Sequence, residues 1–385
     1  MIERMDALTT PSNWQKIRLG DICEIVKGQQ INKISLNNTD KYPVINGGID
    51  FLGYTNKFNV SKNTIAISEG GTCGYVRFMT SDFWSGGHNY SLQKISNKVN
   101  NLCLYHILKS YEKDIMKLGV GSGLKNIQLK ALKDFEIPLP PLNEQIAIAN
   151  ILSGLDRYLC ALDALILKKE GVKKALSFEL LSQRKRLKGF NQAWQRVKVK
   201  DFGIIITGST PLTQISEYWN GTISWITPTD INDNKDIFNS ERKITQKGLN
   251  TIRMIPKDSV LVTCIASIGK NAILRVNGAC NQQINAIIPN KDFNADFIYY
   301  LMENNKQYLL GKAGVTATYI ISKQVFEEID FFVPKDLNEQ IAIANILSAL
   351  DNEIASLKNK KRQFENIKKA LNHDLMSAKI RVLEK

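Results

Sequence analysis

Histidine is scarce in this chain of 385 residues, and its cysteines are few and dispersed. The histidines are His88, His106 and His373, and the cysteines are Cys23, Cys73, Cys103, Cys160, Cys264 and Cys280. No C-x-x-C pair occurs and the cysteines lie far apart, so we predict no metal site and no disulfide framework. Such cysteines favour a reducing, cytosolic setting.

Long apolar runs are also missing. No stretch approaches 18 uncharged apolar residues, and the segment Met1–Pro11 carries Glu3, Arg4 and Asp6 instead of the apolar region of a signal peptide. We therefore expect a cytoplasmic protein that is neither secreted nor membrane-spanning.

Signatures of common catalytic sites are missing too. Gly269-Lys270 and Gly311-Lys312 lack the earlier glycine and the following hydroxyl residue of a phosphate-binding loop. Pro140-Pro141 lacks the flanking residues of an amino-methyltransferase site, and no Pro-Asp pair opens a nuclease-type acidic cluster. We predict no catalytic residue and no cofactor bound by this chain, which we interpret as a binding protein.

Positive charge is abundant. The chain has 51 Lys+Arg against 37 Asp+Glu, a net charge of +14, and 43% of its residues are hydrophobic. This composition indicates an ordered protein with a polyanionic partner, and its length allows two or three domains.

The sequence contains an internal repeat. Leu142–Ser153 (LNEQIAIANILS) recurs without change as Leu337–Ser348, and Val172–Ser182 resembles Ile367–Ser377 at the same offset of 195 residues. A second pair of similar segments begins at Trp14 and at Trp194, at an offset of 180 residues. Between these signatures the two halves differ, so the order is variable, constant, variable, constant.

Each constant block predicts a long amphipathic helix. Prolines precede both blocks, and the first helix is expected from about Asn143 to Leu187, on the order of 65 Å. Its apolar stripe needs a partner, and the second copy in the same chain is the obvious one. Lys169, Lys173, Lys361 and Lys368 interrupt the stripes. The predicted helix–helix seam consists of Ile148, Leu152, Leu155, Leu159, Leu162, Leu176, Ile343, Leu347, Leu350, Ile354, Leu357 and Leu371.

The variable segments predict two α/β (α+β) domains on mixed sheets. Strands are expected at 64–68, 75–79 and 260–266, and helices at 102–118 and 297–310. The predicted organisation is an N-terminal extension (1–11), a first domain (12–140), a first helix (141–188), a second domain (189–335) and a second helix (336–385).

Duplex DNA suits two basic, similar domains joined by long helices, because each domain can read one half-site at a fixed spacing. Two alternatives stay open. One is a self-contained DNA methyltransferase or nuclease, and the other is a basic coiled-coil scaffold whose charge is incidental.

Several of these segments carry a resemblance to a known family. They are Pro138–Asp156, its twin Pro334–Asp351, the two tryptophan openings, and Trp219–Ile231 and Asn281–Ile284 in the second half. With them the chain resembles the specificity (S) subunit of Type I restriction-modification enzymes.

This resemblance implies two tandem target-recognition domains, each reading half of a split DNA site, with an internal pseudo-two-fold repeat. It also implies that the helices pack antiparallel, set the spacing and dock two methylase (M) subunits, which bind S-adenosylmethionine and methylate adenine at N6. Restriction (R) subunits, the translocase-nuclease that uses ATP and Mg, would join for cleavage. Catalysis would then lie in the partners, and the location would be cytoplasmic, on the nucleoid.

Polar residues in glycine-flanked loops are the candidates for base reading, since Asn or Gln pairs with adenine and Arg or Lys with guanine. These are Asn46, Ser68, Glu69, His88 and Asn89 in the first domain and Thr210, Thr229, Lys270 and Thr316 in the second. Lys27, Arg77, Lys125 and Lys270 are candidates for phosphate contacts. For each residue the alternative is a structural turn or a solvated surface position.

Overall fold

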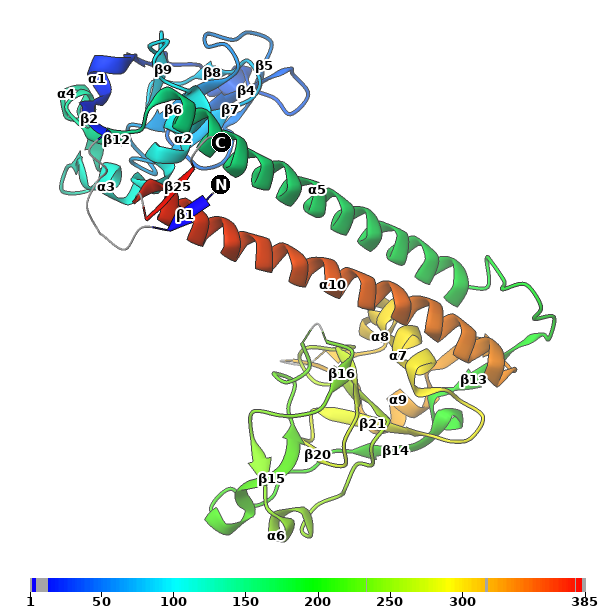
Figure 1. Cartoon of the computed structure of the whole chain (residues 1–385). Coiled ribbons are helices and arrows are strands. Elements are labelled where there is room, and N and C mark those ends of the chain that lie inside the picture. Colours follow the sequence, from blue (N-terminus) through cyan, green and yellow to red (C-terminus); the bar gives the residue numbers. More distant parts are fainter. Residues whose placement is uncertain (1, 5–12, 233, 316–317, 378, 383–385) are drawn as a thin grey trace. The chain divides into compact units, whose positions relative to one another are not determined.

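The computed structural model describes residues 2–4, 13–232, 234–315, 318–377 and 379–382. The chain divides into two compact units, Met1–Ala164 with Asn359–Lys385, and Leu165–Lys358. Each unit contains one variable domain and a part of each long helix, which Figure 1 shows as α5 (Leu142–Leu181) and α10 (Leu337–Met376).

The first unit has a four-stranded antiparallel sheet in the order β3-β9-β6-β7. Its strands are β3 (Glu24–Lys27), β6 (Thr64–Ser68), β7 (Val76–Met79) and β9 (Asn89–Gln93). A smaller sheet, β5-β4-β8, contains β4 (Tyr42–Ile45), β5 (Gly53–Thr55) and β8 (Trp84–Ser85). The remaining elements are β2 (Gln15–Arg18), α1 (Leu19–Ile22), η1 (Lys33–Ser35), α2 (Asn101–Ser110), α3 (Glu112–Lys117), β10 (Gly119–Val120), β11 (Asn126–Ile127), α4 (Leu129–Lys133) and β12 (Glu136–Leu139), with β12 antiparallel to β2.

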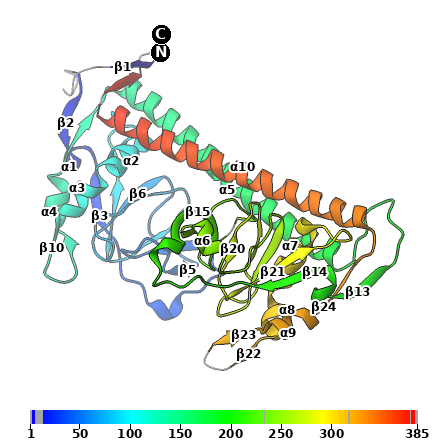
Figure 2. The same cartoon turned by 90° about the horizontal axis from the view of Figure 1, so that it is seen from below.

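The second unit has the same framework. Its main sheet is β14-β21-β18-β19-β16, made of β14 (Gly203–Thr207), β16 (Asp236–Ile237), β18 (Ser259–Thr263), β19 (Asn271–Leu274) and β21 (Ile284–Pro289). A sheet in the order β17-β15-β20 contains β15 (Trp219–Ile226), β17 (Lys243–Ile244) and β20 (Ala279–Cys280). The other elements are β13 (Trp194–Lys198), η2 (Val199–Phe202), η3 (Ser216–Tyr218), α6 (Gln246–Leu249), α7 (Ala295–Asn304), α8 (Lys306–Gly311), β22 (Gly314–Val315), β23 (Tyr319–Ile320), α9 (Lys323–Glu328) and β24 (Asp330–Pro334). In Figure 2, α7 lies beside α10.

The α+β class predicted from the sequence is confirmed in both units. The predicted strand at 64–68 is β6, and the one at 75–79 contains β7. The predicted helix at 102–118 is two consecutive helices, α2 and α3, because Tyr111 interrupts the helical backbone. The predicted helix at 297–310 is likewise α7 followed by α8.

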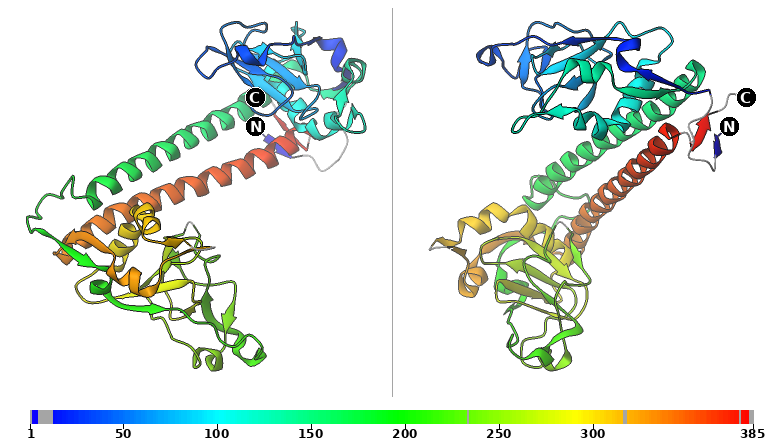
Figure 3. Two further views of the ribbon diagram at one scale, coloured as in Figure 1. Left: turned by 180° about the vertical axis from the view of Figure 1, so that it is seen from behind. Right: turned by 90° about the vertical axis from the view of Figure 1, so that its left-hand side faces the viewer.

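The long helices are shorter than predicted. α5 ends at Leu181, six residues before Leu187, because Gln183 takes a left-handed backbone with φ of 60°. α10 ends at Met376 and is followed by β25 (Ile380–Val382), which pairs antiparallel with β1 (Ile2–Arg4) inside the predicted N-terminal extension (Figure 3).

The two helices run antiparallel within each unit. In the first unit Lys361 pairs with Asp163 at 2.6 Å and Lys368 pairs with Asp156. In the second unit Lys169 pairs with Glu353 at 2.8 Å and Lys173 pairs with Asp351. The four lysines that interrupt the apolar stripes therefore bind carboxylates of the facing helix. In the first unit the Tyr158 and Phe364 rings also meet, with centroids 4.7 Å apart.

The helix ends belong to the domain cores. Ile148 and Leu152 are buried in a cluster with the first-domain strands, and Leu371 packs against that cluster. Ile343 and Leu347 are buried in the second-domain core, against which Leu176 packs. Leu162 and Ile354 are also buried, while Leu155, Leu159, Leu350 and Leu357 are half-buried. The strongest apolar packing of these helices is thus against the domains they adjoin.

Candidate nucleic-acid interface

Glu69 is the centre of a polar cluster at one end of the first-domain sheet. Its Oε1 atom accepts hydrogen bonds from Lys27 Nζ at 2.7 Å and from Tyr90 OH at 3.1 Å, and its Oε2 atom lies 3.9 Å from His88 Nδ1. Burial, and then the adjacent Glu69 carboxylate, raise the pKa of Tyr90 to about 12, so this hydroxyl stays a donor. Glu69 is 9% exposed, whereas His88 is exposed beside it.

Close backbone approaches bring three loops together around this cluster. The His88 backbone N–H donates to Asn46 Oδ1 at 3.0 Å, and the Glu69 N–H donates to the His88 carbonyl at 2.8 Å. A Cβ atom on Gly70 would come within 2.2 Å of Asn126 Oδ1. The β10–β11 hairpin thus packs directly on the loop that follows β6.

Ser68, Arg77 and Asn89 line a small cavity next to the cluster, together with Ile45, Gly48, Ala66 and Tyr75. Ser68 Oγ donates to Asn89 Oδ1 at 3.4 Å. Seven of the eight predicted first-domain residues, all except Lys125, thus lie in two adjoining groups. Lys125 is exposed in the β10–β11 hairpin, next to Asn126.

In the second domain the predicted residues lie in separate contacts. Thr210 Oγ1 donates to Gln282 Oε1 at 2.7 Å. The hydroxyls of Thr227 and Thr229 form a hydrogen bond with each other at 2.7 Å. Lys270 is exposed in the loop just before β19, and Thr316 lies outside the described residues. The roles of all these residues in DNA binding stay predictions.

A stacked cation in the second domain was not among the predicted residues. The Arg242 guanidinium lies 4.1 Å from the Trp219 ring centroid and 4.9 Å from that of Trp225, and the two indoles meet edge to face. Two tryptophans six residues apart are the one sequence signal that could have pointed to Arg242.

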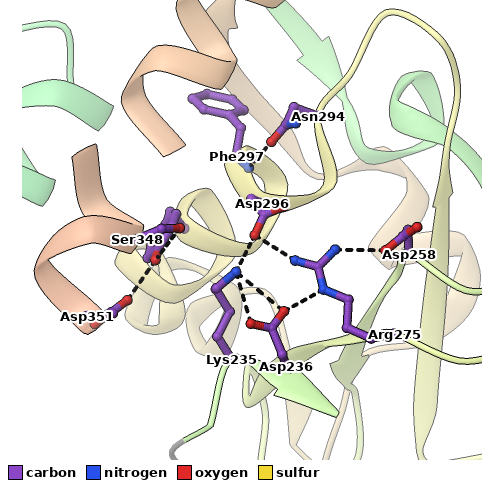
Figure 4. A network of polar contacts seen from close by, with 10 residues as sticks. Lys235, Asp236, Asp258, Arg275, Asn294, Asp296, Phe297, Ser348 and Asp351 are labelled. Carbon is purple, nitrogen blue, oxygen red and sulfur yellow. Dashed lines mark hydrogen bonds and ion pairs between the residues drawn. The ribbon is translucent and has the colours of Figure 1, made fainter. Parts of the chain in front are cut away.

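A network of charges links β16, β19 and α7 in the second domain (Figure 4). Arg275 binds Asp236, Asp258 and Asp296 at 2.6, 2.8 and 2.8 Å, and Lys235 also binds Asp296. Burial alone would raise the pKa of Asp296, but the hydrogen bonds from Lys235 and Arg275 outweigh it and lower this pKa. These five groups pair with one another and link β16 and α7 to the end of β19.

Among the described residues, no group of three or more His, Cys, Asp or Glu side chains could hold a metal ion, and no helix is long and apolar enough to cross a membrane.

Comparison with known proteins identifies the family. The model of the Type I restriction modification DNA specificity domain matches residues 11–169 and again residues 191–366. The chain belongs to this family. It is a type I specificity protein with two specificity domains in tandem.

Relatives agree with this assignment. A Type I restriction enzyme specificity subunit of Methanocaldococcus jannaschii is 25% identical over 416 residues, covering 99% of this chain and 96% of the relative. A Mycoplasma pneumoniae protein named as a type I specificity subunit is 41% identical over 161 residues. That alignment covers 41% of this chain and 43% of the relative, so it spans less than half of the relative's length.

The fold also matches a solved structure. The crystal structure of the S subunit of a Type I restriction-modification system from M. genitalium superposes with a TM-score of 0.71 at 22% identity, covering 96% of this chain and 97% of that one. The tandem-domain fold is therefore that of a known S subunit.

Proposed function

We propose that this chain is the non-catalytic DNA-specificity subunit of a Type I restriction-modification system, and that each domain reads one half of a bipartite site in duplex DNA. The observation that carries the proposal is the duplicated framework with different loops. Trp14 and Trp194 open equivalent strands, and both domains join the same helix sequence, yet the loop residues at the sheet ends differ. A shared framework with divergent polar loops suits two readers of different sequences.

The partners in this proposal are two methylase subunits and the restriction subunits. The methylase subunits bind S-adenosylmethionine and transfer its methyl group to adenine N6, and the restriction subunits use ATP and Mg. The family assignment supports this division of labour, and so does the exposed apolar surface of α5, where Leu165, Leu167 and Val172 are 38%, 72% and 45% exposed. The location in this proposal is the cytoplasm, on the nucleoid.

The spacing between the half-sites is assigned to the helix pair. α5 and α10 are each 40 residues long and continue without interruption from one unit to the other. Within each unit a cross-helix ion pair fixes the register of the two helices, Lys368 with Asp156 in the first unit and Lys173 with Asp351 in the second.

Mapping N6-methyladenine tests the function directly. The chain is co-expressed with its methylase subunit in a methylation-free host, and single-molecule sequencing reads the methylated motif. We expect a split motif with a fixed gap, which disappears without this chain. Exchanging residues 195–330 for those of another family member should change one half-site only. A continuous motif, or a change in both halves, would contradict the proposal.

A further inference from the structure

Arg77 is held in the first domain by aromatic rings. It lies on β7, and its guanidinium carbon is 4.9 Å from the Phe51 ring centroid and 5.4 Å from that of Tyr75. Its Nη1 atom is buried and has no hydrogen-bond partner among the described residues. A guanidinium offers five donors, and an unsatisfied buried donor is costly, so this arrangement calls for a further partner.

A second unsatisfied donor faces the same cavity. Asn89 is 2% exposed, its Nδ2 atom has no partner among the described residues, and it lines the cavity with Arg77 and Ser68. The cavity is too narrow to hold a water molecule, so hydration cannot satisfy these groups. Two donors, from the strands on either side of β6, therefore face one cavity without a hydrogen-bond partner among the described residues.

The cover over Arg77 is thin. Phe51 belongs to the loop between β4 and β5, whose apolar side chains Ile49, Phe51 and Leu52 are 52%, 44% and 37% exposed. Gly47, at the base of this loop, has a left-handed backbone with φ of +81°. Because the Nη1 donor has no protein acceptor, it gives up no hydrogen bond when the side chain turns toward a ligand.

The position is not part of the shared framework. Arg77 pairs with Ala66 across β6 and β7, and the equivalent pair in the second domain is Leu261 with Ala272. Ala272 is fully buried in an apolar cluster. A charged residue that occurs in one domain and is replaced by a core alanine in the other is suited to reading sequence in its own domain.

We propose that Arg77 is a specificity-determining residue that reads a guanine in the half-site of the first domain, donating to its N7 and O6 atoms when Phe51 moves aside on DNA. Arginine matches these two acceptors with two parallel hydrogen bonds, and this contact distinguishes guanine from the other bases. The inference rests on the proposed function, because it needs DNA on this face of the domain.

The test uses the full chain with its methylase subunit. The motifs of wild type, Arg77→Gln and Arg77→Lys are mapped by sequencing, with Arg196→Gln as the control, since Arg196 is an exposed arginine paired with Asp330 in the other domain. Lysine keeps the charge but cannot form the two-pronged contact. We expect both Arg77 variants to lose the guanine requirement at one position of the first half-site, with the second half-site unchanged. The control should keep the full motif.

Binding to duplexes that carry 7-deazaguanine separates base reading from phosphate contact. Removing N7 at that position should weaken wild type about tenfold and weaken Arg77→Lys less, because lysine lacks the rigid fork that fixes the two-pronged contact. Thermal unfolding shows whether Arg77→Gln is folded. If it is not, the motif of Arg77→Lys is used to test the proposal. A half-site without guanine, an unchanged motif, or equal weakening of both proteins would overturn the proposal. Absence of any wild-type methylation would instead count against the proposed function.

Discussion

The indole Nε1 of Trp14 donates a hydrogen bond to Glu144 Oε2 at 3.1 Å across 130 residues of sequence, and Trp194 makes the same bond to Glu339 Oε1 at 3.2 Å. All four side chains are at most 6% exposed. The first strand of each domain is thus fixed to the first turn of the helix that leaves it. This bond explains why tryptophan and glutamate recur together in both halves.

Replacing Trp14 with phenylalanine should destabilise the first unit by about 1–3 kcal/mol, because a hydrogen bond to a buried carboxylate is lost. Chemical denaturation followed by circular dichroism measures this. Trp84→Phe is the matched control, since its indole donates to the Gln29 carbonyl at a more exposed site. A smaller effect at Trp14 than at Trp84 would contradict the role of the Glu144 contact.

The cross-helix ion pairs should show coupling in a double-mutant cycle. For Lys368 and Asp156, which are 28% and 39% exposed, we expect a coupling of up to about 1 kcal/mol in the unfolding free energy. The equivalent cycle for Lys173 and Asp351 should give a similar value. Coupling absent from both cycles would show that these contacts do not contribute to helix pairing.

Acid should destabilise the first unit through His106. Burial lowers the pKa of His106 to about 4, against the opposing charge of Asp156 and with a smaller contribution from the positive charge of Lys368. In the unfolded chain this imidazole becomes protonated near pH 6.5, whereas in the folded chain it stays neutral down to about pH 4. The contribution of neutral His106 to the free energy of unfolding is therefore complete above pH 6.5 and is lost between pH 6.5 and 4.

Between pH 7.5 and 5 this difference is worth about 2 kcal/mol. His106→Gln should therefore lose that much less stability than wild type over this range, as measured by denaturant unfolding at both values. Equal losses in the two proteins would contradict a neutral, buried His106.

Lengthening both helices should lengthen the gap in the methylated motif. Seven residues inserted after Ala164 and after Lys358 keep the helix faces aligned and add about 10 Å, or about three base pairs at 3.4 Å each. Both half-sites should stay the same. An insertion in α5 alone is the control and should abolish methylation, because it breaks the register of the ion pairs. An unchanged gap with both insertions would contradict the spacing role.

The sequence by itself determined the repeat, the two long helices and the α+β class of the domains. The exact recurrence of Leu142–Ser153 and the spacing of its apolar residues are properties of the sequence alone. They can be recognised without knowing which residues are in contact. It also drew attention to most of the polar first-domain residues, because glycine-flanked polar side chains mark loops.

Only the tertiary structure decided which groups meet. In the sequence, four lysines interrupt the apolar stripes of the long helices without an evident reason. The structure shows that each forms an ion pair with a carboxylate of the facing helix; they are Lys169, Lys173, Lys361 and Lys368. The surroundings of the Arg77 guanidinium could not be predicted from the sequence either. They depend on Phe51 and Asn89, which come from other strands and loops. Contacts between residues far apart in the sequence depend on how the strands and helices pack. A local pattern of residues does not contain this information.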